Sequence, residues 1–427
     1  MNTISVSNGL SVVQIKLLLS DGSTQDFLSD NIQLDSAVFV DRLDGFSEYV
    51  YSLRASTDTY VNNLLKEAFG SGDPTIQVRV GVGTPGGTTT WLPWQTHTVH
   101  RYGAALFGQT GSTGYLTKMF SRDKLWNWSR YNKITVRKGT VSGIVESIAN
   151  TYGIGTVIET TGGSLTPLTF VQSSMSDDKF IRERMIPRAV NQNGRGGYRL
   201  FVKDDKLHFH TLDYQANTLS LVYYTGGAIQ LSHADRSQKL IEMGASGVRY
   251  LAHDPYTGDT KEFLSDPESS LKLATSAPLT YDVIGAQRNI QWHVGVNGPD
   301  EVAAMANAKY DTVKSHAFAI KVKMPQSIDA RVGDFVQLSI TNDGTNAPWS
   351  GLYYIGTTAR SLVKSSMMTE MVLFRGEYED DTNNFNGLAN SDPSVVTSNT
   401  SSPGQSPNLA QSTDELDTND PENAILS

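Results

Sequence analysis

The chain has 427 residues, with 35 basic and 44 acidic side chains, a formal net charge of −9 and no cysteine. The lack of cysteine excludes a disulfide framework and a thiolate metal site, and it fits a protein assembled in a reducing cytoplasm. No apolar run approaches roughly eighteen residues, and the first residues lack a basic stretch followed by an apolar core, so we expect neither a membrane span nor a signal peptide.

Acidic charge is concentrated near the end of the chain. Ten acidic residues and no basic residue lie from Glu377 onward, which leaves 34 acidic against 35 basic residues in the rest. No basic cluster interleaved with aromatic residues occurs, so the sequence does not support tight, salt-dependent binding of nucleic acid. The length allows roughly two to four domains.

Residues 1–126 carry mainly strand signals. Apolar and polar residues alternate over 13–19 and over 76–82, and each run leads into a glycine-containing turn. Between them, residues 60–69 show apolar residues at helical spacing and end at Gly70, which predicts one helix packed against the sheet.

Two helix signals follow in residues 127–215. The first is an apolar stripe over 141–152, with Thr140 as the N-cap and Gly153 at the stop. The second begins at Ser176 as the N-cap, has Asp177-Asp178 in its first turn, and ends near Pro187.

A change of period from helical to two comes directly after these helices. Residues 198–203 and 206–211 alternate around Asp204-Asp205, which predicts a β-hairpin because Asp tolerates left-handed backbone in a turn. Residues 127–215 are therefore predicted to form a small helix-helix-hairpin module.

Residues 216–378 return to strand signals. Strands are predicted over 219–224, 318–324 and 335–340, with a last hairpin that pairs 352–362 with 367–378. Pro299 followed by acidic residues predicts a helix over 299–315, and the polar residues 258–290 predict a long loop. A β-rich segment with one helix thus occurs twice, and we detect no residue-level repeat between the two.

Residues 379–427 form an acidic, low-complexity tail. Its low hydrophobicity and uniform charge predict a segment that becomes ordered only against a partner chain. The candidate partner-interface residues are Asp380, Asp381, Asp414, Glu415, Ile425 and Leu426.

The search for chemical motifs yields no catalytic or cofactor site. No phosphate-binding loop, nucleophile elbow or zinc-protease motif occurs, and the two glycine-rich stretches are typical of turns. His208 and His210 share one strand face, as two metal ligands would, but no third ligand is evident, so a polar strand face is the favoured interpretation. We therefore predict no metal and no cofactor.

Six carboxylates at four places in the chain are candidates for acid/base pairs. Each has a simpler structural interpretation: Glu146 on the polar side of a helix, Glu183 among arginines, Asp177-Asp178 at a helix start, and Asp204-Asp205 in a turn. We therefore predict that the chain is not an enzyme.

Taken in order, these elements resemble a known family. The stretches that carry the resemblance are KGTVSGIVESIANTYG, SDDKFIRERMIPRA, GGYRLFVKDDKLHFH, HDPYTG, DEVAAMANAKY, RVGDFVQL and GLYYIGTTARSL. Their order is similar to that in baseplate hub (tail hub) proteins of contractile-tailed bacteriophages, to phage late-control proteins and to the N-terminal part of the type VI secretion spike. The resemblance covers residues 10–378.

The resemblance implies an α+β, mainly β fold with two tail-tube-like β-barrel domains, residues 1–126 and 216–378, flanking the module 127–215. It further implies a homotrimer that joins the hexameric tail tube to the trimeric central spike, touches other baseplate or wedge proteins, and lines a channel for genomic DNA without binding it specifically. Such a protein is a virion component of the tail baseplate, assembled in the cytoplasm of the host bacterium.

A second hypothesis concerns the central module alone. The stretch KGTVSGIVESIANTYGI resembles the opening of a lysin-motif repeat. The alternative function is therefore a tail component that binds or degrades peptidoglycan through this module.

Overall fold

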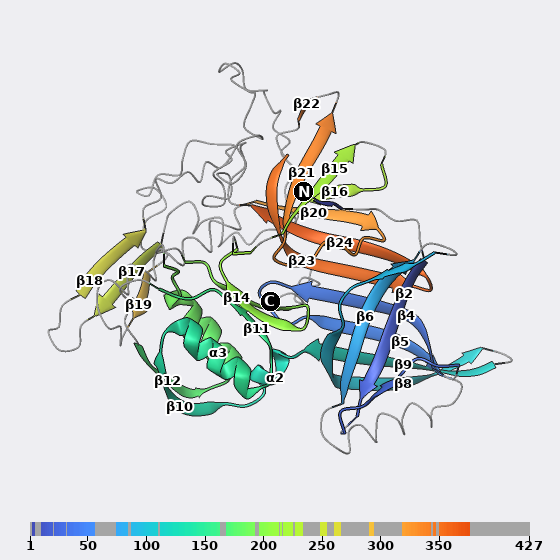
Figure 1. Cartoon of the computed structure of the whole chain (residues 1–427), viewed down its shortest axis with the longest axis horizontal. Helices are drawn as coiled ribbons and strands as arrows, with labels where there is room; N and C mark the ends of the chain where they lie inside the picture. Colours follow the sequence, from blue (N-terminus) through green and yellow to red (C-terminus); the bar gives the residue numbers. More distant parts are fainter. Residues whose placement is uncertain are drawn as a thin grey trace, which may run out of the picture. The chain divides into compact units, whose positions relative to one another are not determined.

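The computed structural model describes residues 2–4, 10–19, 21–30, 32–55, 74–83, 87–109, 112–162, 168–192, 196–212, 214–215, 217–224, 227–233, 248–253, 260–265, 290–293, 318–342, 345–346 and 350–375. The chain divides into two units, residues 1–389 and 390–427, and every described residue belongs to the first. This unit is mainly β (Figure 1).

The described strands and helices fall into three consecutive segments of the chain. The first half contains β2 (Leu10–Leu18), β3 (Thr24–Asp26), β4 (Ile32–Arg42), β5 (Glu48–Ala55), β6 (Thr75–Gly83), β7 (Thr89–Trp91), β8 (Gln95–Gln109) and β9 (Ser112–Asp123). The central module contains α2 (Trp126–Ser129), β10 (Lys133–Gly139), α3 (Val141–Thr151), β11 (Thr156–Ile158), β12 (Leu168–Met175), α4 (Asp177–Phe180), the π turn η1 (Ile181–Met185), the 3-10 turn η2 (Ile186–Arg188), β13 (Arg199–Lys203) and β14 (Lys206–His210). The second half contains β15 (Thr218–Tyr224), β16 (Gln230–His233), β17 (Val248–His253), β18 (Thr260–Ser265), β19 (Ile290–His293), β20 (Phe318–Pro325), β21 (Phe335–Asn342), β22 (Thr345–Asn346), β23 (Gly351–Val363) and β24 (Ser366–Arg375), and β1 (Asn2–Thr3) pairs with its β15.

Alternation of apolar and polar residues forms the strands of the first half as predicted. The runs at 13–19 and 76–82 become β2 and β6, which pair antiparallel along their whole length. Val13, Ile15 and Leu17 of β2 point to the buried side, and the sheet folds over so that they share a core with Phe39 and Tyr51 of β4 and β5.

The two halves have the same strand order. If strands of two or three residues and the separate sheet β18-β17-β19 are set aside, the first half is hydrogen-bonded in the order β4-β5-β9-β8-β6-β2. The second half follows β16-β20-β24-β23-β21-β15, with β15 and β16 green and β20 to β24 orange in Figure 1. If the six strands of each half are numbered one to six along the chain, both halves have the order 2-3-6-5-4-1 across the sheet.

The halves also share their register. Four consecutive residue pairs join β6 to β8, starting with Thr75 opposite Thr98, and four join β21 to β23, starting with Phe335 opposite Tyr354. Two residues past Thr98 and Tyr354, one residue is skipped in the pairing with the next strand: His100 in β8 and Gly356 in β23. The register therefore repeats across five of the six strands of each half, although the sequence shows no repeat that we could detect.

The last pair in each order differs between the halves. β2 and β6 are antiparallel, whereas β15 and β21 are parallel. The described strands of each half form an open sheet, and closure of either half into a barrel stays a prediction.

The two halves join edge to edge. Residues 357–363 of β23 pair antiparallel with residues 36–42 of β4, so one continuous sheet runs through both halves. β23 is long enough for this because its first residues, 351–354, pair with β21 before the strand turns to β4.

The central module has its own core. Thr140 caps α3 by accepting a hydrogen bond from Gly143 N, and Gly153 follows the helix with φ +64°. α3 contacts β10, β11 and β14, and its apolar stripe is buried with α4 and the hairpin β13-β14. The hairpin turn uses left-handed backbone at Asp204 and Asp205, as predicted.

Several predictions need correction or lie outside the described residues. The module contains more than two helices and a hairpin, because β10 pairs with β12 and β11 adds a parallel strand to β14. The predicted loop at 258–290 is wrong for residues 260–265, which form β18. The helices predicted at 60–69 and 299–315 and the tail 379–427 lie outside the described residues. Across the described part of the chain, no helix combines the length and apolar character that a membrane span requires.

Candidate functional site

A glycine marks the point where β23 changes partners. Gly356 is the skipped residue between the part of β23 that pairs with β21 and the part that pairs with β4. A Cβ at this position would collide with the ring of Phe374, and the Gly356 carbonyl accepts a hydrogen bond of 2.9 Å from Leu43 N. Close packing at this point therefore requires glycine.

A buried ion pair lies where the two halves join. Arg360 of β23 donates to Asp41 Oδ2 of β4 at 3.1 Å, and both side chains are almost fully buried. Asp41 also accepts hydrogen bonds from Thr358 and from the hydroxyl of Tyr49. Arg360 donates further to the carbonyls of Ser327 and Ala330. The charges are thus neutralised and hydrogen-bonded on both sides of the junction, as a buried pair requires.

A histidine packs beside this pair. His97 of β8 stacks on Tyr49 with the ring centroids 4.0 Å apart, and its Nδ1 lies 3.3 Å from Ser121 Oγ. Burial lowers the pKa of His97 to about 4, so this side chain is neutral at pH 7. Burial likewise raises the pKa of the nearby Asp123 to about 7, although its carboxylate accepts the N–H groups of Ser47 and Leu125.

The hairpin turn of the central module contacts the first half. Asp205 accepts a hydrogen bond of 2.9 Å from Thr96 N and pairs with Lys124 Nζ at 2.7 Å. Asp204 and Asp205 both have left-handed backbone. In this turn the Asp205 carboxylate points away from the hairpin, toward Thr96 of β8 and toward Lys124, which follows β9.

The same turn contacts the second half. Arg331 pairs with Asp204 at 2.8 Å, and Lys203 pairs with the buried Asp334 at 2.6 Å. Burial raises the pKa of Asp334 despite its two cationic neighbours. One turn of the module is therefore held by charged groups from both halves.

An apolar cluster joins all three segments behind this turn. It contains Leu43 of the first half, Phe201 of the module, and Val332, Phe335 and Tyr354 of the second half. Arg199 of β13 adds an ion pair of 2.8 Å to Asp44 of the first half. We call the Asp41–Arg360 pair, the Asp204-Asp205 turn and this apolar cluster the three-segment junction. It is the candidate functional site, and its chemistry holds segments together.

The histidine pair singled out by the sequence is structural. His208 Nδ1 and His210 Nε2 lie 3.1 Å apart, and His208 stacks on Phe201. The two histidines share one strand face, and this face is largely buried: burial, together with the adjacent His210, lowers the pKa of His208 to about 3. In the residues that the structure describes, no group of three potential ligands that could hold a metal is found.

The carboxylates considered for catalysis do not converge. Asp177 begins α4 as predicted, but it is fully buried and receives hydrogen bonds from Lys133, Tyr152 and Gln172. Burial favours a raised pKa for Asp177, and these hydrogen bonds reverse the effect, so its pKa is lowered. Glu146 is exposed on α3, as expected, and the exposed Glu183 lies 3.8 Å from Lys179. Of these groups, Asp177 stabilises local structure in the module through its buried hydrogen bonds.

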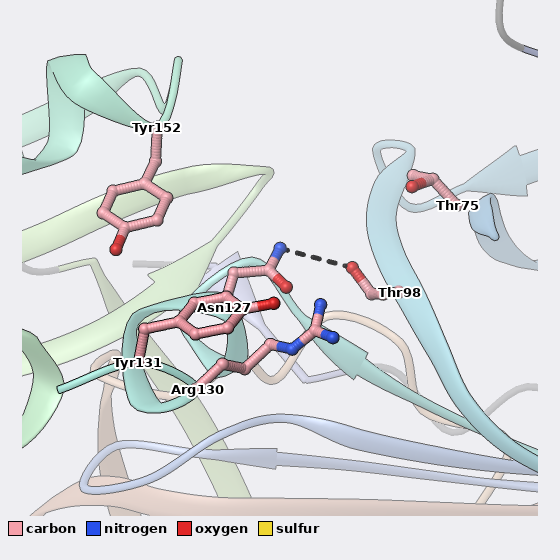
Figure 2. A pocket seen from close by; sticks show the side chains of 6 residues that line it. All are labelled: Thr75, Thr98, Asn127, Arg130, Tyr131 and Tyr152. Carbon is pink, nitrogen blue, oxygen red and sulfur yellow. Dashed lines mark hydrogen bonds between the residues drawn. The ribbon is translucent and has the colours of Figure 1, made fainter. Parts of the chain in front are cut away.

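A shallow hollow lies between the first half and the module. It measures about 340 Å³ and is lined by Thr75, Thr98, Asn127, Arg130, Tyr131 and Tyr152. Figure 2 shows the Tyr131 ring and the Arg130 guanidinium side by side, with Asn127 bonded to Thr98 across the hollow. The hollow brings the tyrosine rings of Tyr131 and Tyr152 together with the polar side chains of Asn127 and Arg130.

The sequence did not indicate the ion pair of Asp41 with Arg360 or the contacts that the Asp204-Asp205 turn makes with both halves. The interface residues predicted from the sequence lie elsewhere in the chain. Asp380, Asp381, Asp414, Glu415, Ile425 and Leu426 lie outside the described residues, so their role stays a prediction.

The architecture defines a class of protein in which two alike β segments and a small α/β module form one unit around a structural junction. Among solved structures, a 43 kDa tail protein of prophage MuSo2 from Shewanella oneidensis matches with a TM-score of 0.53 and 10% identity over 85% of this chain and 98% of that chain. A tail protein from Neisseria meningitidis MC58 matches with a TM-score of 0.52 and 10% identity over 87% and 97%. The E. coli c3393 protein, a component of the type VI secretion system, matches with a TM-score of 0.48 and 9% identity over 84% and 76%.

No protein-family model and no curated protein matches the sequence. The first two structures nevertheless agree with this chain over most of their length and most of its own. The chain therefore has the fold of these two tail proteins, one of them from a prophage, in agreement with the resemblance of the sequence.

Proposed function

We propose that this chain is the structural hub of a contractile phage tail baseplate, a homotrimer that joins the hexameric tail tube to the trimeric central spike. The observation that carries the proposal is the repeat of strand order and register in two halves that join edge to edge. Three chains of this kind present six similar β segments on one side and three modules on the other, as a three-to-six adaptor requires.

The proposed domains are residues 1–126 and 216–378 as tube-like β-barrel domains, 127–215 as the central module, and 379–427 as the acidic tail. In this role the ring encloses a channel through which genomic DNA passes, and the module and tail contact the spike or other baseplate or wedge proteins. A near-neutral body suits such a channel, because basic groups would hold phosphates by counterion release and slow transit.

The role is structural, so the protein is not an enzyme and needs no cofactor. Its place is the virion, in the tail baseplate, after assembly in the cytoplasm of the host. The similarity of fold to two phage tail proteins supports this assignment.

Analytical ultracentrifugation of the full chain tests the trimer. We expect a species of about three times the 46.6 kDa chain mass at micromolar concentration, alone or after addition of tail tube or spike protein. A folded monomer under all these conditions would contradict the adaptor role.

The hollow beside Tyr131 favours one alternative function, in which the chain binds peptidoglycan. An exposed aromatic ring next to Asn127 and Arg130 is a suitable platform for a sugar ring and its polar substituents. Co-sedimentation of the full chain with insoluble peptidoglycan tests this alternative. Binding that Tyr131→Ala abolishes and Tyr131→Phe retains would support it, and the absence of binding would remove it.

A further inference from the structure

Each half has one strand that continues past its partner. In the second half, β23 pairs with β21 up to Tyr354, passes the skipped Gly356, and then pairs with β4 of the first half. In the first half, β8 pairs with β6 up to Thr98, passes the skipped His100, and continues to Gln109. No described strand pairs with residues 103–109 of β8 on the edge that corresponds to the β4-binding edge of β23.

The strand that corresponds to β4 also has an open edge. β4 and β16 hold the same place in the strand order of their halves, next to β5 and β20. β4 pairs with β5 on one side and β23 on the other. β16 pairs with β20, and no described strand pairs with its other side.

The shared register relates the two edges residue by residue. Across four strands of the first half, Phe39 lies opposite Tyr49, Tyr49 opposite Ser121, and Ser121 opposite Val99. The corresponding series in the second half is His233, Ile320, Leu373 and Ile355. Residues 36–39 of β4 therefore correspond to residues 230–233 of β16, and residues 357–363 of β23 correspond to residues 101–107 of β8.

Some residue types also agree between corresponding positions of the two halves. Thr117 and Met119 of β9 correspond to Thr369 and Met371 of β24, which are the same residue types. In the sequence, Asp235-Arg236 follows His233 at the same distance at which Asp41-Arg42 follows Phe39.

We propose that residues 104–107 of β8 in one subunit pair antiparallel with residues 230–233 of β16 in a second copy of this chain. The register copies the junction within the chain, where Ser36 to Phe39 lie opposite Val363 to Arg360. In the subunit contact, Ala104 lies opposite His233, Ala105 opposite Ser232, Leu106 opposite Leu231, and Phe107 opposite Gln230. This inference rests on the proposed trimer and names the surface that forms it.

This contact closes a ring in which the open edges of β8 and β16 are both paired. Each subunit offers its β8 edge to one neighbour and its β16 edge to the other, which is a heterologous contact that closes at three copies if the six β segments are evenly spaced. Pairing also removes two open strand edges, which are otherwise sites of uncontrolled association.

The absence of cysteine allows a clean test by disulfide formation in the full chain. We expect the double variant Ala105→Cys, Ser232→Cys to form covalent trimers on mild oxidation, since directly opposite residues on antiparallel strands have the Cβ spacing that a disulfide needs. Neither single variant should give covalent species above the background of the parent chain, because a heterologous contact does not bring a position against its own copy.

Two further variants serve as controls. Val38→Cys with Ser361→Cys joins the corresponding pair within one chain and should form an intramolecular disulfide with the same geometry. Ala105→Cys with Gln230→Cys is two residues out of register and should form at least tenfold less covalent trimer.

Sedimentation of the same samples distinguishes a failure of the proposed strand contact from a failure of the adaptor role. If trimers form and the intrachain control oxidises while the Ala105/Ser232 variant stays uncrosslinked, the proposed contact is wrong and the adaptor role stands. If no trimer forms with or without partner proteins, the adaptor role itself fails.

Discussion

At the scale of single residues, the pair Asp41 and Arg360 decides whether the two halves stay joined. Both side chains are buried, and Asp41 accepts three hydrogen bonds in total. Asp41→Ala leaves the guanidinium buried without its counter-charge, so we expect the free energy of unfolding to fall by about 3–5 kcal/mol. Urea denaturation followed by fluorescence measures this loss.

The double variant Asp41→Ala, Arg360→Met is the matched control for that prediction. It removes both charges and keeps an apolar side chain of similar length, so it should recover most of the lost stability. Equal stability of parent and Asp41→Ala proteins would show that the pair does not hold the junction.

His97 gives stability a predictable dependence on pH. Its pKa is about 4 in the folded chain against about 6.5 when unfolded, so only the unfolded chain takes up this proton between the two values. Stability from His97 is therefore complete above pH 6.5 and is lost as pH falls toward 4, at up to about 1.4 kcal/mol per pH unit.

His97→Gln isolates this contribution, because glutamine stays neutral throughout the range. Urea unfolding of both proteins at pH 7, 5.5 and 4.5 should show the parent losing stability relative to the variant as pH falls. Parallel curves would mean that His97 is protonated as readily in the folded chain as in water.

At the scale of elements, the hairpin β13-β14 attaches the central module to both halves. Replacing its turn by Asp204→Asn, Asp205→Gly keeps residues suited to left-handed backbone and removes both carboxylates. We expect the hairpin to stay folded while the contacts to Thr96, Lys124 and Arg331 are lost.

Hydrogen exchange distinguishes the two effects of this turn replacement. The amide of Thr96, which donates to Asp205, should exchange at least tenfold faster, whereas the amides within β13 and β14 should keep their protection. Loss of protection in both strands would mean that the carboxylates maintain the hairpin itself.

The elements with strong local signals were predictable from sequence. Thr140 and Gly153 bracket α3, Ser176 caps α4, and Asp204-Asp205 forms the hairpin turn, because caps and left-handed residues act within a few positions of the chain. β10 and β12 were missed, although Ile134 and Val136 of β10 alternate with polar residues. Their apolar side chains, together with Val171 of β12, lie on the exposed face, so this alternation does not mark a buried face as it does in β2 and β6.

The junction could not be predicted from sequence, because its pairs join residues that lie far apart in the chain. One signal was present: Asp41 alternates in phase with Ala37 and Phe39 on a buried face, and Arg360 in phase with Leu362. An inward charge of each sign on two strands indicates a buried pair, but the sequence does not say that the strands are neighbours.

At the scale of the whole molecule, the two halves repeat strand order and register without a detectable sequence repeat, and the proposed adaptor role depends on this repeat. The pairing of five strands and the places of the skipped residues His100 and Gly356 are the same, while the side chains at most positions differ. In the proposed ring, divergent side chains allow the halves to meet different neighbours while the strands keep an approximate sixfold geometry.

Electron microscopy of the purified full chain tests this central claim most directly. Class averages of particles viewed along the ring axis should show threefold symmetry with a sixfold-like outline around a central channel. Particles that remain single subunits, or rings of any other symmetry, would contradict the account.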